Sequence, residues 1–273
     1  MGTTVLSADY SDHIAIKKTH YHDCCQILFI TRGTASVTVN GRHYRVCGGD
    51  LVIFSRLEHH AVTDQSEDYQ RYILDLEPNI PDKEAYRLYS VLFNRPAGFR
   101  NILDVRQEQQ EFQRLFETIR IEFSSRGTMR EEMLELLVQQ LLISVYRQAP
   151  EAFSAVEEDR IELVYRLQMR FHREFQTRFV LSELAEEYSI SVSYLSHLFK
   201  LATGTSVMDY LQSCRIAEAK KCLAESLMRV GEIVEHCGFS DASNFSRTFR
   251  NATGLSPSEF REKYYHASSQ QAE

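Results

Sequence analysis

Two segments in the last third of the chain place hydroxyl and cationic side chains on one helical face. In each segment an apolar stripe marks the buried face and leaves polar residues opposite. The outward positions are Ser193, Ser196, His197 and Lys200 in the first segment, and Ser243, Ser246, Arg247 and Arg250 in the second. Such side chains hydrogen-bond base edges in the major groove, and Lys and Arg neutralise phosphates. The two faces are candidate nucleic-acid contacts.

A second group of candidate functional residues, nearer the N-terminus, consists of histidines. His20 and His22 are two residues apart, and His60 follows Glu58 and His59. Imidazole can hold a metal ion, hydrogen-bond a small polar molecule, or satisfy a local hydrogen bond at a strand end. The residues alone leave these three roles open.

The two candidate nucleic-acid faces belong to an internal repeat. Residues 181–210 align with residues 230–260 at a shift of 49, which becomes 50 after one inserted residue. Glu183 pairs with Glu232 before the insertion, and Ser196 pairs with Ser246 after it. A period of about 50 residues that occurs twice indicates duplication of one unit rather than a solenoid.

Each copy of the repeat predicts a helix, a tight turn and a second helix. We expect Ser191 and Ser240 to cap the second helices, and Gly204 and Gly254 to end them. One long helix over residues 208–224 should join the copies. Two helix-turn-helix units connected in this way can enter successive segments of the major groove. The expected phosphate contacts are Lys200, Arg215, Lys220, Lys221 and Arg250.

Short runs rich in β-branched and aromatic residues dominate the N-terminal part. We expect strands over residues 26–30, 35–39, 43–46, 51–54 and 69–76. Asn40-Gly41 lies between two of these runs and predicts a two-residue hairpin, because both residues tolerate positive φ. Many short strands at this spacing are typical of a small barrel or sandwich.

Helical periodicity begins near residue 81 and defines the remaining parts of the chain. We expect a helix over residues 82–94 and two longer helices under the apolar stripes of residues 112–123 and 133–145. A capping box at Ser154 and Glu157 should open the next helix after a linker. The sequence predicts an α+β chain of two domains, with a strand-rich barrel (1–80), a helical segment that can dimerise (81–147), a linker (148–159), an all-α domain with two helix-turn-helix units (160–266) and a disordered tail (267–273).

The C-terminal motifs resemble those of the AraC-type (AraC/XylS) transcription regulators. They are Ser182-Glu183-Leu184-Ala185, Ser193-Tyr194-Leu195-Ser196 with Phe199-Lys200, Ile233-Val234 with Cys237-Gly238-Phe239, Phe245-Ser246-Arg247 with Phe249-Arg250, and Gly254 with Ser256-Pro257. The resemblance covers about residues 161–265 and implies binding to double-stranded promoter DNA. The expected DNA-binding set is Ser191, Ser193, Ser196, His197, Lys200, Ala242, Ser243, Asn244, Ser246, Arg247 and Arg250. Ser189 departs from the second unit, which has Gly238, without threatening the fold.

The N-terminal part resembles the cupin barrel that is fused to such DNA-binding domains. Metal-binding cupins use a His-x-His pair, a carboxylate four residues later and a further histidine. The corresponding positions here are His20, His22, Gln26 and His60. Gln26 replaces the anionic ligand, which disfavours a tight catalytic metal site. We therefore expect these four residues to hydrogen-bond a small polar effector, and we expect no cofactor. Carbohydrate is the family's commonest effector class, but no residue here selects it.

Three other classes of protein are alternatives to a regulator. A cupin enzyme needs a bound metal and leaves the C-terminal repeat unexplained, and the sequence has no Ser-His-Asp or P-loop signature. A protein-interaction module, or a helical bundle with merely solvated faces, leaves the outward hydroxyls and cations without a role. We therefore expect a regulator and not an enzyme.

Charge, cysteine usage and hydropathy agree with a DNA-binding protein of the cytoplasm. The net charge of −7, taken alone, argues against nucleic acid, but the acidity lies in the N-terminal half, because residues 160–266 hold 14 Lys and Arg against 13 Asp and Glu. The six cysteines form no CxxC pair, which favours reduced thiols. No apolar run approaches the roughly 20 residues of a membrane span, and no secretory signal is evident. Expected partners are promoter DNA, a small-molecule effector, RNA polymerase and a second copy of the chain, with no membrane.

Overall fold

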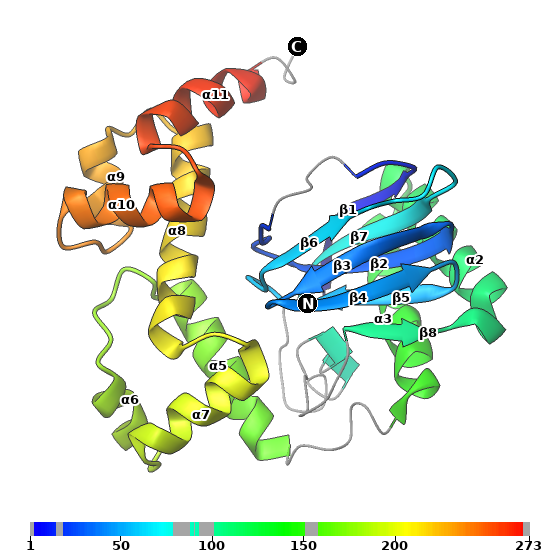
Figure 1. Cartoon of the computed structure of the whole chain (residues 1–273), viewed down its shortest axis with the longest axis horizontal. Coiled ribbons are helices and arrows are strands. Elements are labelled where there is room, and N and C mark those ends of the chain that lie inside the picture. The colour runs from blue at the N-terminus through cyan, green and yellow to red at the C-terminus, as the bar shows by residue number, and fades with distance from the viewer. Residues whose placement is uncertain are drawn as a thin grey trace. The chain divides into compact units, whose positions relative to one another are not determined.

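The computed structural model describes residues 3–14, 19–78, 88–89, 91–92, 101–150 and 158–269. The chain divides into two compact units at about residue 162. The N-terminal unit holds strands β1 to β8 with helices α2 and α3, and the C-terminal unit holds helices α5 to α11 (Figure 1). Within the described ranges, no helix combines the length and apolar character that crossing a bilayer requires.

Two antiparallel sheets form the framework of the N-terminal unit. The larger sheet has the strand order β1-β7-β2-β5-β8, and the smaller has the order β4-β3-β6. The strands are β1 (Thr3–Ser11), β2 (Cys25–Arg32), β3 (Thr34–Val39), β4 (Arg42–Cys47), β5 (Asp50–Phe54), β6 (His60–Thr63), β7 (Gln70–Pro78) and β8 (Ile102–Asp104). Strand β2 is central in the larger sheet, where it pairs with both β7 and β5.

Burial explains the sequence pattern of each strand. Residues Cys25 to Ile30 of β2 are all buried, because one face of the larger sheet packs on helices and the other on the smaller sheet. Ile27 and Phe29 belong to the helix-facing core, whereas Leu28 belongs to the core between the sheets. Strand β3 has only one covered face, so its buried residues alternate with half-buried ones.

Helices α2 (Gln109–Ser124) and α3 (Arg130–Gln148) cover the outer face of the larger sheet (Figure 1). Their stripes bury Phe112, Phe116 and Val138, among others, in the core that contains Phe29 of β2. The rings of Phe29 and Phe116 stack with centroids 5.4 Å apart. The two predicted helices are confirmed, and among the described residues the core between the two sheets is built from strands and loops.

The five expected strands are present as β2 to β5 and β7, and the hairpin prediction is confirmed by φ values of 49° at Asn40 and 79° at Gly41. Strands β1, β6 and β8 were not predicted. Strand β8 lies inside the segment 81–147 that we expected to be helical, and it pairs with β5. Its three residues are too few to show a period, so only the tertiary pairing reveals it.

Parts of three sequence predictions lie outside the described residues. These are most of the helix expected over residues 82–94, the capping box at Ser154 and Glu157, and residues 270–273 of the expected tail. Helix α11 continues to Ser269, so residues 267–269 are helical where we expected disorder.

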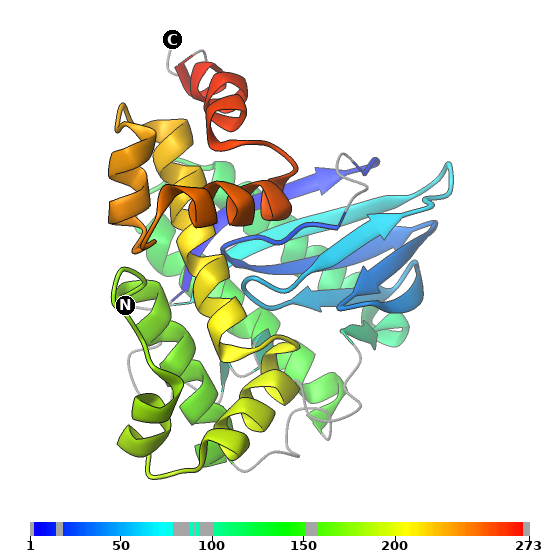
Figure 2. The same cartoon turned by 60° about the vertical axis from the view of Figure 1, so that its left-hand side comes forward.

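The C-terminal unit consists of two helix-turn-helix units joined by one helix. The helices are α5 (Glu158–Arg173), α6 (Leu181–Glu187), α7 (Val192–Thr203), α8 (Val207–Glu225), α9 (Val230–His236), α10 (Ala242–Thr253) and α11 (Pro257–Ser269). Helix α8 passes from α5–α7 at one end to α9–α11 at the other (Figures 1 and 2). The predicted α+β chain with an N-terminal sheet domain and a double helix-turn-helix domain is confirmed.

Candidate DNA-binding and ligand-binding sites

Each helix-turn-helix unit turns in the same way after its first helix. In the first unit Ser189 has a φ of 55°, its N–H donates to the Glu186 carbonyl, and the Ile190 N–H donates to the Ala185 carbonyl, both at 2.9 Å. These two bonds form a Schellman motif, which needs a left-handed residue. The same pattern recurs in the second unit, where Gly238 has a φ of 71°. Ser189 therefore adopts the conformation that its counterpart achieves with glycine.

The caps of the two second helices differ from the prediction in one case. The Ser191 hydroxyl accepts from the Tyr194 N–H at 3.1 Å, as a cap of α7 should. Helix α10 is capped by Asp241, whose carboxylate accepts from the Asn244 N–H at 2.7 Å, and not by Ser240 as we predicted. The prediction was wrong because the inserted residue lengthens the second turn, so that Asp241 occupies the position that corresponds to Ser191.

Buried residues on α7 and α10 turn the remaining residues outward. Leu195, Leu198 and Phe199 are buried on α7, and Phe245 and Phe249 are buried on α10. The expected DNA contacts Ser191, Ser193, His197, Lys200, Ala242, Ser243, Ser246, Arg247 and Arg250 are exposed, while Ser196 and Asn244 are half-buried. The Arg247 guanidinium donates to the Asn244 side-chain oxygen at 3.3 Å. Both exposed faces therefore begin at the N-terminal ends of their helices.

Helix α8 supports both helix-turn-helix units. Tyr210 in its first half contacts the rings of Phe171 and Phe199, with centroids 6.5 and 5.4 Å away. Ile216 and Leu223 in its second half join the core of α9 to α11. A helix of 19 residues is about 28 Å long. Both units therefore share one buried support.

Arg215 has a structural role that the sequence did not predict. Its guanidinium donates to the carbonyls of Phe175 and Thr177 at 2.8 and 3.0 Å, which ties the loop after α5 to α8. Burial lowers the pKa of Arg215. These contacts engage two donors of the guanidinium within the unit, so Arg215 stabilises the domain, and its predicted phosphate contact stays a prediction.

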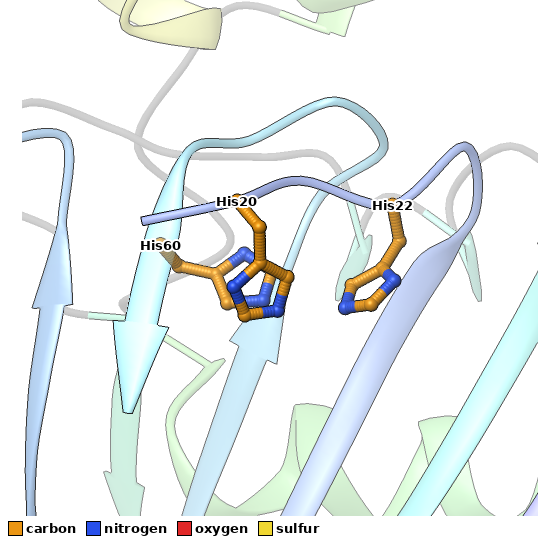
Figure 3. A group of neighbouring side chains, drawn as sticks. All are labelled: His20, His22 and His60. Carbon is orange, nitrogen blue, oxygen red and sulfur yellow. The ribbon is translucent and has the colours of Figure 1, made fainter. Parts of the chain in front are cut away.

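In the N-terminal unit the structure brings together the three histidines singled out from the sequence. One ring nitrogen of each of His20, His22 and His60 lies within 4.8 Å of the others, and Figure 3 shows the rings on the same side of the backbone. The ring centroids of His20 and His60 are 4.6 Å apart, and those of His22 and His60 are 5.2 Å apart. His20 and His60 also exchange two backbone hydrogen bonds of 2.8 Å, which hold the cluster together.

His60 is the buried member of this cluster, and its ring is held from two sides. Its Nδ1 lies 2.8 Å from the carbonyl of Glu58, and the Phe54 ring stacks on it with centroids 3.8 Å apart. A carbonyl only accepts hydrogen bonds, so Nδ1 carries the hydrogen and Nε2 presents a lone pair. Burial lowers the pKa of His60 to about 3, so the ring is neutral at neutral pH.

A buried carboxylate fixes the loop that carries His60. Glu58 accepts hydrogen bonds from the Ser55 N–H at 2.9 Å and from the Asn101 amide at 3.0 Å. Asn101 also donates to the carbonyl of Ile53 in β5. The sequence drew attention to Glu58 only as part of a histidine-rich motif, whereas the structure assigns it the role of loop anchor.

Gln26 differs from the histidines in its contacts. Its amide donates to Asp75 at 2.7 Å across the β2–β7 pair, and Ser7 of β1 donates to the other oxygen of the same carboxylate at 2.8 Å. The nitrogen of Gln26 is therefore engaged by β7, and the three histidines form the cluster without it.

An open groove of about 1110 Å³, which the sequence did not predict, lies between β1, β7 and α2. Tyr72 of β7 donates a hydrogen bond at 3.0 Å to Glu117 of α2, which also pairs with Arg120. This arrangement raises the pKa of Tyr72 to about 12 through burial and the Glu117 carboxylate. Residues so far apart in the chain give no common signal in the sequence.

Both units of the chain match known protein families. Residues 1–142 match the family described as an AraC-like ligand binding domain, and residues 184–263 match a helix-turn-helix domain. The HTH-type transcriptional activator RhaR of Shigella dysenteriae is 27% identical over 246 residues, which cover 89% of this chain and 86% of RhaR. RhaR of Escherichia coli O139:H28 gives the same values.

Solved structures show the same fold. ToxT from Vibrio cholerae with a bound unsaturated fatty acid has a TM-score of 0.60 at 12% identity and covers 95% of both chains. ToxT bound to (E)-4-(8-methylnaphthalen-1-yl)but-3-enoic acid has a TM-score of 0.62 at 14% identity and covers 96% of this chain and 98% of ToxT. The ligand-binding family spans more than half of the chain and the helix-turn-helix family covers both of its units, so the protein belongs to the AraC family of DNA-binding transcription regulators with an N-terminal ligand-binding domain.

Proposed function

We propose that α7 and α10 are the two recognition helices of this regulator. The observation that carries the proposal is their equivalence. Each follows the same Schellman turn, starts at a side-chain cap and exposes a polar face at its N-terminal end. Successive turns of the major groove on one face of DNA lie about 34 Å apart. A shared support about 28 Å long is of the right scale for helices that enter consecutive turns.

The exposed residues divide by chemistry into two roles. Arg247 and Ser243, one turn apart on α10, hydrogen-bond base edges, and Arg247 suits a guanine. His197 and Ser193 take the corresponding places on α7. Lys200 and Arg250 lie further along the two helices and contact phosphates, as do the exposed Ser191 before α7 and the backbone of the exposed Ala242 at the start of α10. Ser196 and Asn244, being half-buried, reach DNA less readily and help to orient their neighbours.

An affinity measurement tests this assignment. Arg247→Ala should weaken binding to the preferred site by about 1–3 kcal/mol and relax the preference at one base pair. Arg178→Ala is the matched control, because Arg178 is also exposed but lies in the loop between α5 and α6. The control should lower affinity on all sequences by the same small factor or leave it unchanged. An unaltered base preference in Arg247→Ala would remove this residue from the recognition set.

The effector of the regulator, we infer, binds at the histidine cluster of the N-terminal unit. His20, His22 and His60 present polar nitrogens beside the apolar core between the sheets, as ligand sites commonly do. Gln26, whose amide donates to Asp75, is the fourth residue that we assign to this effector site. Binding would favour one conformation of the protein and so change its occupancy of the promoter. A carbohydrate or a carboxylate such as the fatty acid bound to ToxT offers suitable oxygen atoms.

Exposed apolar residues on α3 indicate that a second copy of the chain packs against this helix. Met133, Leu136 and Ile143 lie on the side of α3 opposite its buried stripe and are 47%, 62% and 41% exposed. An apolar stripe left in water at spacings of 3 and 7 residues is typical of a helix that packs on another. We propose that this stripe forms the homodimer contact.

The remaining parts of the proposal follow from the relatives. RhaR is described as an activator, so we propose that this protein activates transcription by contacting RNA polymerase at its promoter. Because its promoter DNA lies in the cytoplasm, we propose that the protein acts there. The relatives are transcription regulators, and we propose that this chain likewise has no enzymatic activity.

A further inference from the structure

His60 already has the arrangement of a metal ligand. Its Nδ1–H is bound by the Glu58 carbonyl, and its Nε2 is buried with no hydrogen-bond partner among the described residues. Leaving a buried acceptor without a partner destabilises a fold, so such an atom calls for a ligand. Metal-binding histidines characteristically donate their second ring N–H to a carbonyl or carboxylate, which fixes the tautomer and aims the other nitrogen at the ion.

The other two histidines complete a set of three nitrogens. His20 and His22 are half-buried, and one nitrogen of each lies within 4.8 Å of the nitrogen of His60. An ion that binds imidazole at about 2.1 Å in tetrahedral geometry holds its ligand atoms about 3.4 Å apart. The half-buried rings can close this difference by turning about their side-chain bonds, while the buried ring of His60 stays fixed against Phe54.

We propose that His20, His22 and His60 bind one divalent late first-row transition metal ion, such as Zn²⁺, at the ligand site of the N-terminal domain. This inference deepens the proposed effector site and rests on it. Imidazole nitrogen suits Zn²⁺, Co²⁺, Ni²⁺ and Cu²⁺, whereas Mg²⁺ and Ca²⁺ require oxygen ligands that this cluster lacks. Three protein ligands leave at least one position open, where an oxygen atom of the effector binds.

The missing carboxylate does not remove the site. Gln26 occupies the place of an acidic ligand, and its amide is bound to Asp75. The ligand atoms of His20, His22 and His60 lie together without any contribution from Gln26. Loss of the anionic ligand changes the charge of the site and not its three-nitrogen geometry.

A second cluster of metal-binding residue types lies in the C-terminal unit and serves as an internal comparison. Glu218, Cys222 and His236 also place one atom each within 4.8 Å of one another. There Glu218 accepts hydrogen bonds from both the Cys222 thiol and His236. Burial and the Glu218 carboxylate raise the pKa of Cys222 to about 11. The polar atoms of this cluster already hydrogen-bond one another, unlike the buried Nε2 of His60.

Metal titration of the full chain tests the proposal. The protein is dialysed against a chelator, the chelator is removed, and Zn²⁺ is titrated by calorimetry. Co²⁺ then provides visible absorption bands that report coordination by nitrogen. We expect one ion per chain, and a loss of affinity of at least about 100-fold in His22→Gln and His60→Gln. The half-buried His22 keeps the test valid if the buried His60 variant does not fold. His43→Gln, at an exposed histidine of β4, and Cys222→Ser should bind the ion like the parent.

The outcomes separate this inference from the proposed function. No stoichiometric binding, or equal affinity in His22→Gln and the parent, overturns the metal site, and a buried water or a polar effector is then the partner of Nε2. If Cys222→Ser alone loses the ion, the site lies in the C-terminal unit and the proposal is wrong. Selective DNA binding by the same metal-free protein shows that the regulator function stands without the metal.

Discussion

Substitution of Gly238 by alanine should destabilise the second helix-turn-helix unit strongly. The left-handed conformation at φ 71° costs about 1–2 kcal/mol for a residue with a Cβ. A Cβ on Gly238 would also lie 2.6 Å from the carbonyl oxygen and 2.9 Å from the Cα of Gln176, and both are backbone atoms that must move. Such overpacking costs about 1–3 kcal/mol. The restricted unfolded chain returns about 0.4–1 kcal/mol, which leaves a net loss of about 1–5 kcal/mol, centred near about 3 kcal/mol.

Gly231→Ala is a matched control within the neighbouring helix α9. A Cβ at Gly231 meets no atom within 4 Å, and Gly231 is not among the residues with positive φ. Alanine there should stabilise the helix by about 0.5–1 kcal/mol, because glycine has the lower helix propensity. Ser189→Gly should be neutral or stabilise the first unit by up to about 1 kcal/mol, since it relieves the strain at φ 55°.

Hydrogen exchange measured by peptide-level mass spectrometry in increasing urea gives the midpoint for α9 and α10 in the full chain. At a slope of about 2 kcal/mol per molar urea, a loss of about 3 kcal/mol in Gly238→Ala should lower this midpoint by roughly 1.5 M. Gly231→Ala should raise it slightly. A midpoint for Gly238→Ala equal to that of the parent, or lower stability in Gly231→Ala, would refute the account of the turn.

Three further predictions concern the caps, the dimer and the thiols. Asp241→Ala should cost about 1 kcal/mol of unfolding free energy because α10 loses its cap, whereas Ser240→Ala should have no effect; urea unfolding distinguishes them, and the reverse order would contradict the cap assignment. Leu136→Glu should shift the protein from dimer to monomer in analytical ultracentrifugation, while Glu135→Gln should not, and a monomeric parent would dismiss the α3 stripe. In the native protein at neutral pH the half-buried Cys47 should react with a thiol reagent before the five buried cysteines, because burial removes access and raises the pKa of Cys237 to about 12; peptide mapping that finds Cys237 labelled first would disprove this.

The helix-turn-helix units could be predicted because their signals are local and occur twice. The apolar stripe of α10 and the turn glycine at position 238 lie within a few residues of one another. The cap at Asp241 was missed for an equally local reason. A single inserted residue moves the cap, and an alignment of two copies does not say on which side of the insertion it falls.

The N-terminal site was predictable in its residues and not in its geometry. The sequence singled out His20, His22 and His60, but their approach depends on a backbone bridge between residues 20 and 60. The partner of Gln26 depends on the register of β2 with β7, which places Asp75 directly opposite. Strand β8 and the groove beside α2 are formed by pairings across long stretches of chain, which no local pattern encodes.

Selection from random duplex DNA tests the central claim most directly. The full chain, and separately the segment from Asp159 onward, are used to enrich binding sites, and the affinity for the enriched sites is then measured against salt concentration. The account predicts one motif with two blocks about one helical turn apart and an affinity that falls steeply with salt. Failure of both proteins to enrich any motif, or enrichment of a single block that is unaffected by Arg247→Ala, would contradict it.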